Sequence, residues 1–212
     1  MQKLDRIESK AAPLLQSDID TDAIFPARFL LVIEREKYRE HLFADHRRDG
    51  NFVLDRPQYR GAQILVGGPR FGIGSSREHA VWALADFGIR CIIAPSFGDI
   101  FRANCFKNGV LAIELDGEAL VRVAEAAKSA TYIVVDLNAQ HIEMGNSEAI
   151  PFEINPDRRQ FLLEGLDHID LIRQDEDSIT AFEKSQRVSA PWHFLDLDHM
   201  HRVARAKREA MT

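Results

Sequence analysis

The sequence predicts an α/β domain built on a mixed β-sheet. Between residues 62 and 128, short apolar segments alternate with longer segments of helical pattern, which is typical of parallel strands connected by helices. Residues 131–144 then hold two strand-like segments with no helix between them, which predicts an antiparallel hairpin. The 212 residues and a hydrophobic content of 45% are enough for one globular core.

The N-terminal part has weaker patterns. Residues 4–15 predict a strand, and the Asp- and Ser-rich residues 17–21 predict a loop. Pro26 favours the first turn of a short helix over residues 26–32. Residues 34–60 are rich in charge, so we expect a loop that is poorly ordered until a partner binds, with a turn at 47–51.

From residue 62 onward the elements follow one another regularly. Asn108 and Gly109 form a favourable stop for the second helix, and Asn138 with Ala139 suits the turn of the hairpin. The predicted strands are 62–67, 91–94, 110–115, 131–137, 141–144 and 152–154, and the predicted helices are 76–87, 97–107, 117–128 and 157–163.

Composition restricts the partners and the location of the chain. We expect one domain over residues 1–197 and a basic tail, 198–212, that is either a frayed helix or disordered. The net charge of −6 argues against nucleic acid, and no apolar run is long enough to cross a membrane. The N-terminus has no secretory signal pattern, and Cys91 and Cys105 lie in apolar segments. These features predict a cytoplasmic protein with two buried free thiols.

Residues 70–80 carry the strongest functional signal. This run, Arg-Phe-Gly-Ile-Gly-Ser-Ser-Arg-Glu-His-Ala, lies between a predicted strand and a predicted helix. The free N–H groups and positive dipole end of a helix favour an anion, and glycines allow a ligand to approach the backbone. The run therefore predicts a carboxylate or phosphate site, although a serine N-cap beside a tight glycine turn explains it equally well.

Three common glycine-rich motifs do not fit this run. Arg77 occupies the place of the third glycine of a dinucleotide-binding fingerprint, where its side chain would block helix–strand packing. No Gly-Lys-Ser/Thr follows for a P-loop, and no glycine follows Ser75 or Ser76 at the spacing of a nucleophile elbow.

Four ordered segments together resemble the swivel domain of the aconitase superfamily, and in particular the small subunits of bacterial 3-isopropylmalate dehydratases. They are Gly74–Ala80, Asp20–Pro26 (Asp-Thr-Asp-Ala-Ile-Phe-Pro), Ile93–Phe101 and Asn104–Gly109. The resemblance implies an aconitase-type swivel domain, with a mixed sheet or barrel core flanked by helices. It also implies a hydro-lyase of leucine biosynthesis that interconverts 2- and 3-isopropylmalate through isopropylmaleate.

The same resemblance implies that the chain holds half an active site. In this family a [4Fe–4S] cluster is held by cysteines of a separate large subunit. This chain is expected to bind no metal, in keeping with its two cysteines, since such clusters take three or four thiolates. The expected partners are the large subunit and a small dicarboxylate substrate.

Residue roles carry over by position. Ser75 aligns with the serine that acts as base, with Arg77 and Asp22 as its catalytic neighbours. Each unit by which the serine pKa is lowered costs about 1.36 kcal/mol, and a helix N-terminus supplies at most about 2 kcal/mol. Arg77 is therefore needed as a second source of positive field, and we expect Asp22 to orient Arg77 or Ser75.

Substrate binding is expected from Ser76, Gly74 and Thr21, and from Arg28 toward the distal carboxylate. The apolar residues 29–32 either contact an isopropyl group or belong to the core. Glu78 and His79 are expected to be structural, the first because a negative charge is favourable in a first helical turn.

One position departs from the family pattern. Ile73 stands where the usual run has cysteine between its two glycines, and this change can alter the shape of the pocket. It leaves open a hydro-lyase for another substituted malate, such as citramalate or dimethylmalate. A separate alternative is a non-catalytic anion-binding subunit, which would keep the helix N-terminus but would not depend on Ser75 for turnover.

Overall fold

The computed structural model describes residues 1–31, 37–74, 77–145 and 148–193. Contacts divide the chain into two compact units, Met1–Asp167 and His168–Thr212. The domain boundary predicted between residues 197 and 198 lies outside the described residues, as does the tail 198–212, so both stay predictions.

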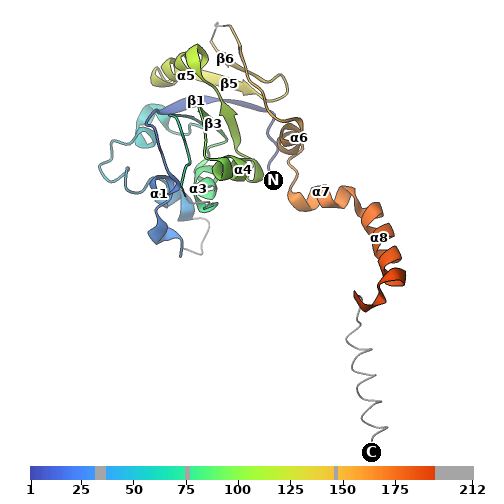
Figure 1. Cartoon of the computed structure of the whole chain (residues 1–212). Coiled ribbons are helices and arrows are strands. Elements are labelled where there is room, and N and C mark those ends of the chain that lie inside the picture. The colour runs from blue at the N-terminus through green and yellow to red at the C-terminus, as the bar shows by residue number, and fades with distance from the viewer. Residues whose placement is uncertain (32–36, 75–76, 146–147, 194–212) are drawn as a thin grey trace, which may run out of the picture. The chain divides into compact units, whose positions relative to one another are not determined.

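The first unit is built on a seven-stranded mixed sheet with the strand order β4-β3-β2-β1-β5-β6-β7 (Figure 1). Strands β1 to β4 pair in parallel, whereas β1–β5, β5–β6 and β6–β7 pair antiparallel. The bounds are β1 Arg6–Leu14, β2 Ile64–Gly67, β3 Cys91–Ala94, β4 Leu111–Glu114, β5 Tyr132–Asp136, β6 His141–Met144 and β7 Ile150–Pro151. The predicted α/β class and the predicted hairpin are confirmed.

Helices cover the parallel part of the sheet, with α5 on one side of β1 and with α3 and α4 on the other (Figure 1). Because β2 and β3 are covered in this way, every residue of both strands is buried, as parallel strands require. The longer helices are α3 His79–Phe87, α4 Asp99–Lys107, α5 Gly117–Lys128 and α6 Pro156–Glu164. The shorter ones are α1 Thr21–Ile24 and α2 Tyr38–His41, with 3₁₀ turns η1 Ala27–Phe29, η3 Val53–Asp55 and η4 Pro57–Tyr59.

Residues 37–60 are more structured than their charge suggests. They contain α2, η3 and η4, and their apolar side chains enter the core. Phe43 and Leu42 are fully buried, and the hydroxyl of buried Tyr59 donates to the carbonyl oxygens of Ala127 (3.0 Å) and Lys128 (3.2 Å). A few apolar anchors among many charges therefore give this segment a defined path.

The strand predicted at 152–154 is wrong. The last strand, β7, ends at Pro151, which lies opposite His141 at the start of β6. Beyond that pair, residue 152 lies opposite the turn that joins β5 and β6 rather than opposite a strand. The N–H of Phe152 makes one further hydrogen bond, to the carbonyl oxygen of Gln140 in this turn (3.0 Å). An apolar segment cannot extend a sheet where the neighbouring strand has ended.

The second unit contains α7 His168–Gln174, α8 Glu176–Ser189 and η5 Pro191–His193, none of which the sequence analysis anticipated. Helix α8 has Glu176 and Asp177 in its first turn and Arg187 in its last, which complements the helix dipole. None of its described residues is buried. No described helix of either unit has the length and hydropathy needed to cross a bilayer.

Candidate functional site

The predicted site lies where three parallel strands end. The loops that follow β1, β2 and β3 run side by side and are connected by backbone hydrogen bonds. On one side of the middle loop, the N–H of Gly72 donates to the carbonyl oxygen of Ile19 (2.6 Å) and the N–H of Thr21 donates to that of Ile73 (3.0 Å). On the other side, Phe71 forms an isolated parallel bridge with Phe97. The carboxyl edge of a parallel sheet is where α/β proteins commonly bind ligands.

Two glycines make this close packing possible. Gly72 has φ +74°, and a Cβ built on it would lie 2.2 Å from Cγ of Phe101 in α4. A Cβ on Gly98 would lie 2.5 Å from the carbonyl oxygen of Gly72. The first glycine of the run therefore serves loop packing, and the second, Gly74 (φ +94°), lies beside Thr21, whose Oγ1 would be 3.7 Å from its Cβ.

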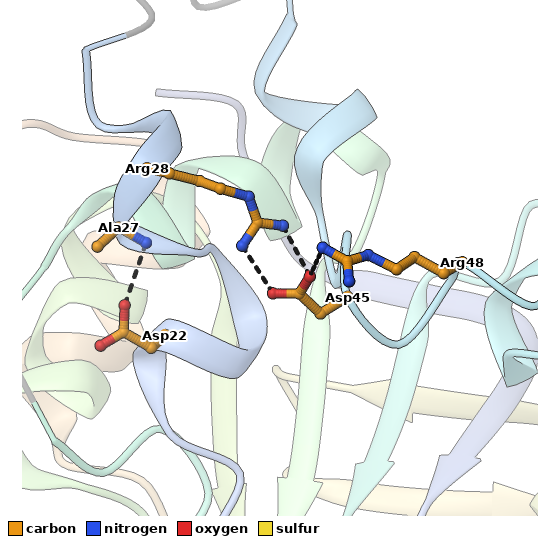
Figure 2. A network of polar contacts seen from close by, with 5 residues as sticks. All are labelled: Asp22, Ala27, Arg28, Asp45 and Arg48. Atoms are coloured by element: carbon orange, nitrogen blue, oxygen red, sulfur yellow. Dashed lines mark hydrogen bonds and ion pairs between the residues drawn. The ribbon is translucent and has the colours of Figure 1, made fainter.

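The Asp-Thr-Asp segment folds as a capped turn of helix. The carboxylate of Asp20 accepts from the N–H of Ala23 (2.6 Å), which is the usual N-cap bond of an aspartate. Thr21 is buried at the start of α1. Asp22 is half-exposed, and its carboxylate accepts from the N–H of Ala27 (3.1 Å; Figure 2).

Asp22 also makes an ion pair with Arg77. A terminal nitrogen of Arg77 donates to the same oxygen of Asp22 that accepts from Ala27. The arginine side chain is 24% exposed and the aspartate side chain 52% exposed. Two predicted catalytic residues from separate loops thus meet, and Arg77 is held at the carboxyl edge of the sheet.

The helix after the glycine run begins later than predicted. Helix α3 starts at His79 rather than at residue 76, and its first bonds run to the carbonyl oxygens of Arg77 and Glu78. Side-chain contacts hold residues 77 and 78 to α1 and to the end of α4. Arg77 binds Asp22, and the carboxylate of Glu78 accepts from Nδ2 of Asn108 (2.7 Å). The N-terminus of α3 and its dipole therefore lie at His79, three residues later than predicted.

Ser75 and Ser76 themselves lie outside the described residues. The roles predicted for both serines therefore stay predictions.

Arg28 is engaged by a carboxylate of its own chain. Its two terminal nitrogens donate to the two oxygens of Asp45, each at 2.8 Å, and Arg48 reaches one of these oxygens at 2.6 Å (Figure 2). The hydrogen bond to Asp45 raises the pKa of Arg28, and the same bond lowers the pKa of Asp45. Phe29 and Leu30 pack against the core, Leu31 is 90% exposed, and Val32 lies outside the described residues.

Glu78 and His79 have structural surroundings. Asn108 is the C-cap of α4 and ties Glu78 to that helix. The ring of His79 packs among aromatic rings, with centroids 4.7 Å from Trp82 and 6.2 Å from Phe25. Both residues therefore position α3 beside the loops.

Both cysteines are buried free thiols, as predicted. Burial raises the pKa of Cys91 and of Cys105, so the thiolate that a metal needs is disfavoured at both. Among the residues that the structure describes, no group of three His, Cys, Asp or Glu side chains is placed to hold a metal ion.

Sequence reasoning missed two contacts at this site. Asp45 lies in the charged segment after α2, and Asp18 pairs with Arg70 across the first two loops. No short motif marks either aspartate, since each partner is distant in sequence. The available signal for Asp45 was Arg28, because an arginine that is expected to bind a carboxylate can also pair with a carboxylate of its own chain.

Comparison with known proteins agrees with this architecture. The sequence profile of the aconitase C-terminal domain matches residues 1–118, so the chain carries a domain of the aconitase superfamily. A second profile, that of the C-terminal domain of the 3-isopropylmalate dehydratase small subunit, matches residues 174–196.

The chain belongs to the family of 3-isopropylmalate dehydratase small subunits. Such a subunit from Paramagnetospirillum magneticum is 48% identical over 200 residues, which cover 91% of this chain and all of the relative. One from Rhodospirillum centenum is 48% identical over 201 residues, covering 91% and 98%. The crystal structure of a 3-isopropylmalate dehydratase from Methanocaldococcus jannaschii matches with a TM-score of 0.65 at 26% identity, covering 84% of this chain and 99% of that one.

Proposed function

We propose that this chain supplies one half of the active site of a 3-isopropylmalate dehydratase and that the enzyme is complete only with a large subunit. The reaction is the dehydration of 2-isopropylmalate to isopropylmaleate and its rehydration to 3-isopropylmalate, a step of leucine biosynthesis in a reducing cytoplasm. The observation that supports this most directly is the ion pair between Asp22 and Arg77, at the carboxyl edge of the sheet and adjacent in sequence to Ser75 and Ser76.

The loss of hydroxide from the substrate needs a Lewis acid. A [4Fe–4S] cluster on the large subunit would supply this chemistry. The small subunit is poorly suited to hold such a cluster, because both of its thiols are buried and their pKa values are raised. The division of labour that the family name suggests is therefore chemically consistent.

This chain would move the proton. Ser75, as alkoxide, takes a proton from the carbon next to a substrate carboxylate during dehydration and returns it during rehydration. Because α3 begins only at His79, the positive field at Ser75 must come mainly from Arg77. Asp22 fixes the guanidinium from the opposite loop, so little reorganisation is needed when the substrate arrives.

The same loop would hold a substrate carboxylate. Arg77 can donate two hydrogen bonds in a fork, while the hydroxyl of Ser76 and the backbone near Gly74 offer neutral donors. Thr21 supports this loop from α1, where it lies beside Gly74. Closure against the large subunit would exclude water and strengthen each of these interactions.

The experiment that tests the proposal is a reconstitution. The chain is mixed with its large subunit under anaerobic, iron-replete conditions, and isopropylmaleate absorbance is followed from 2- and 3-isopropylmalate. We expect turnover only with both subunits and its loss in Ser75→Ala. Turnover of another substituted malate alone would change the substrate, and full activity of Ser75→Ala would leave the chain a non-catalytic anion-binding subunit.

A further inference from the structure

The contact between Arg28 and Asp45 has the geometry of ligand recognition. Both terminal nitrogens of the guanidinium meet both carboxylate oxygens at 2.8 Å, which is the fork arrangement that a bound substrate carboxylate would take. Figure 2 shows the Arg28 side chain reaching to Asp45, with Arg48 on the far side of the same carboxylate. An internal carboxylate thus occupies the donor edge of the arginine that was expected to meet the substrate.

The pair is anchored on both sides. Arg28 lies in η1, whose first residue, Ala27, is held by Asp22. Asp45 lies two residues after Phe43, which is fully buried and whose N–H donates to the carbonyl oxygen of Ile24 (2.8 Å). Both ends of the pair are therefore tied to the segment around α1, which lowers the entropic cost of holding them together.

Neighbouring rings restrict Arg28 further. Its guanidinium carbon lies 4.5 Å from the centroid of the Phe29 ring. That ring stacks on His41 of α2 with a centroid distance of 3.9 Å and an interplanar angle of 7°. The arginine is thus held by a stacked face and a charged edge together, unlike an isolated surface arginine.

The consequence for a ligand is electrostatic. Arg28 and Arg48 carry two positive charges and Asp45 carries one negative charge, so the cluster has a net charge of +1. The lowered pKa of Asp45 keeps it ionised at neutral pH. Asp45 thereby halves the positive charge that a further carboxylate would meet here. Leu31, in the same segment as Arg28, is 90% exposed and offers an alkyl surface.

We propose that Asp45 is a specificity-determining residue: by holding Arg28, it withholds that cation from substrates that carry an additional carboxylate and favours those with an alkyl substituent. This inference rests on the proposed function of the neighbouring site. It assigns a role to a residue that does not itself touch the substrate.

The test uses the reconstituted two-subunit enzyme and two matched inhibitors. Both are succinates: isopropylsuccinate carries an alkyl substituent, and tricarballylate carries a carboxymethyl group in its place. The inhibition constants of both are measured for the wild type and for Asp45→Asn, which removes the charge but keeps the shape. We expect the preference for tricarballylate relative to isopropylsuccinate to rise about twofold to fivefold, the range that an exposed ion pair is worth.

Two further variants separate this effect from loop damage. In Arg28→Met/Asp45→Asn most of the gain should disappear, because Arg28 is absent and only Arg48, whose side chain is 68% exposed, is released. Asp55→Asn makes the same change of charge in another fork, since Asp55 pairs with Arg47 at 2.6 Å, and it should leave the preference unchanged. Thermal unfolding of each variant checks that the domain stays folded.

Three results would overturn the inference. They are an unchanged preference in Asp45→Asn, a gain that persists undiminished in the double variant, and a wild-type enzyme that already binds tricarballylate more tightly than isopropylsuccinate. Failure of the proposed function is distinguishable, because it appears as a wild-type complex that does not turn over isopropylmalate. In that case the two succinates are compared by calorimetric binding to the same complex, and the preference is still read from their dissociation constants.

Discussion

Replacement of Gly72 by alanine tests whether the site loop depends on its close approach to α4. Two costs apply, because φ is +74° and the new Cβ would meet the Phe101 ring at 2.2 Å. The left-handed conformation costs alanine about 1–2 kcal/mol, and overpacking costs about 1–3 kcal/mol. The free energy of unfolding should therefore fall by about 2–5 kcal/mol.

Gly50 is the matched control. Its φ is +68°, nearly that of Gly72, but nothing lies within 4 Å of a Cβ built on it. Gly50→Ala consequently carries the conformational cost alone. The effect of alanine on the unfolded chain is common to both variants and cancels, so their difference of about 1–3 kcal/mol measures the contact with Phe101.

Urea unfolding followed by tryptophan fluorescence provides the assay. The chain has two tryptophans, and Trp192 lies in the second unit, so a Trp192→Phe background leaves Trp82 of α3 to report on the first unit. The slope with urea should be the same in both variants while the midpoint of Gly72→Ala falls further. Equal midpoints for Gly72→Ala and Gly50→Ala would refute the argument that Phe101 restricts position 72.

Three other predictions concern single contacts. Asp22→Asn should lower kcat/KM of the reconstituted enzyme about tenfold, because the charge that orients Arg77 is lost. Asp18→Asn, which breaks the neighbouring pair with Arg70, should leave kcat/KM unchanged. Equal losses in the two variants would mean that Asp22 only joins the loops. Tyr59→Phe should lower the free energy of unfolding by about 1–2 kcal/mol, because its buried hydroxyl donates to two carbonyl oxygens. Tyr132→Phe is the control, since Tyr132 is 59% exposed. Similar losses in both variants would contradict the stabilising role of the Tyr59 hydroxyl. Burial raises the pKa of Cys91 and Cys105, so the folded thiols stay protonated while unfolded thiols ionise near about pH 8.5. The stabilisation is complete below that pH and should fall above it by up to about 1.4 kcal/mol per pH unit per thiol. Urea titrations from about pH 7.5 to 10 should find this slope in the wild type and not in Cys91→Ala/Cys105→Ala.

The fold class followed from local patterns because the central elements obey them strictly. Strands β2 and β3 are short, fully apolar and separated by an amphipathic helix. This strand–helix–strand pattern predicts a parallel sheet. Helix α5 and strand β6 have the predicted bounds for the same reason. The thiols of Cys91 and Cys105 were predictable as buried because they belong to apolar segments.

The family was also accessible from the sequence, since motifs of several residues in a fixed order carry it. The half-site chemistry stays a prediction. The end of the last strand was not accessible, because it depends on where β6 stops providing partners. The start of α3 was also missed, since side-chain contacts of Arg77 and Glu78 with α1 and α4 hold the residues that local propensity would have made helical.

The arrangement of charges was decided by the tertiary structure alone. Asp22 and Arg77 are separated by 55 residues, and Arg28 and Asp45 by 17, yet each pair closes across two loops. A sequence lists which side chains are charged, but a charge acts over a few ångströms, and those distances exist only once the sheet has brought the loop ends together. The sequence by itself therefore determined the class of domain and its family, and the fold determined which charged residues face one another.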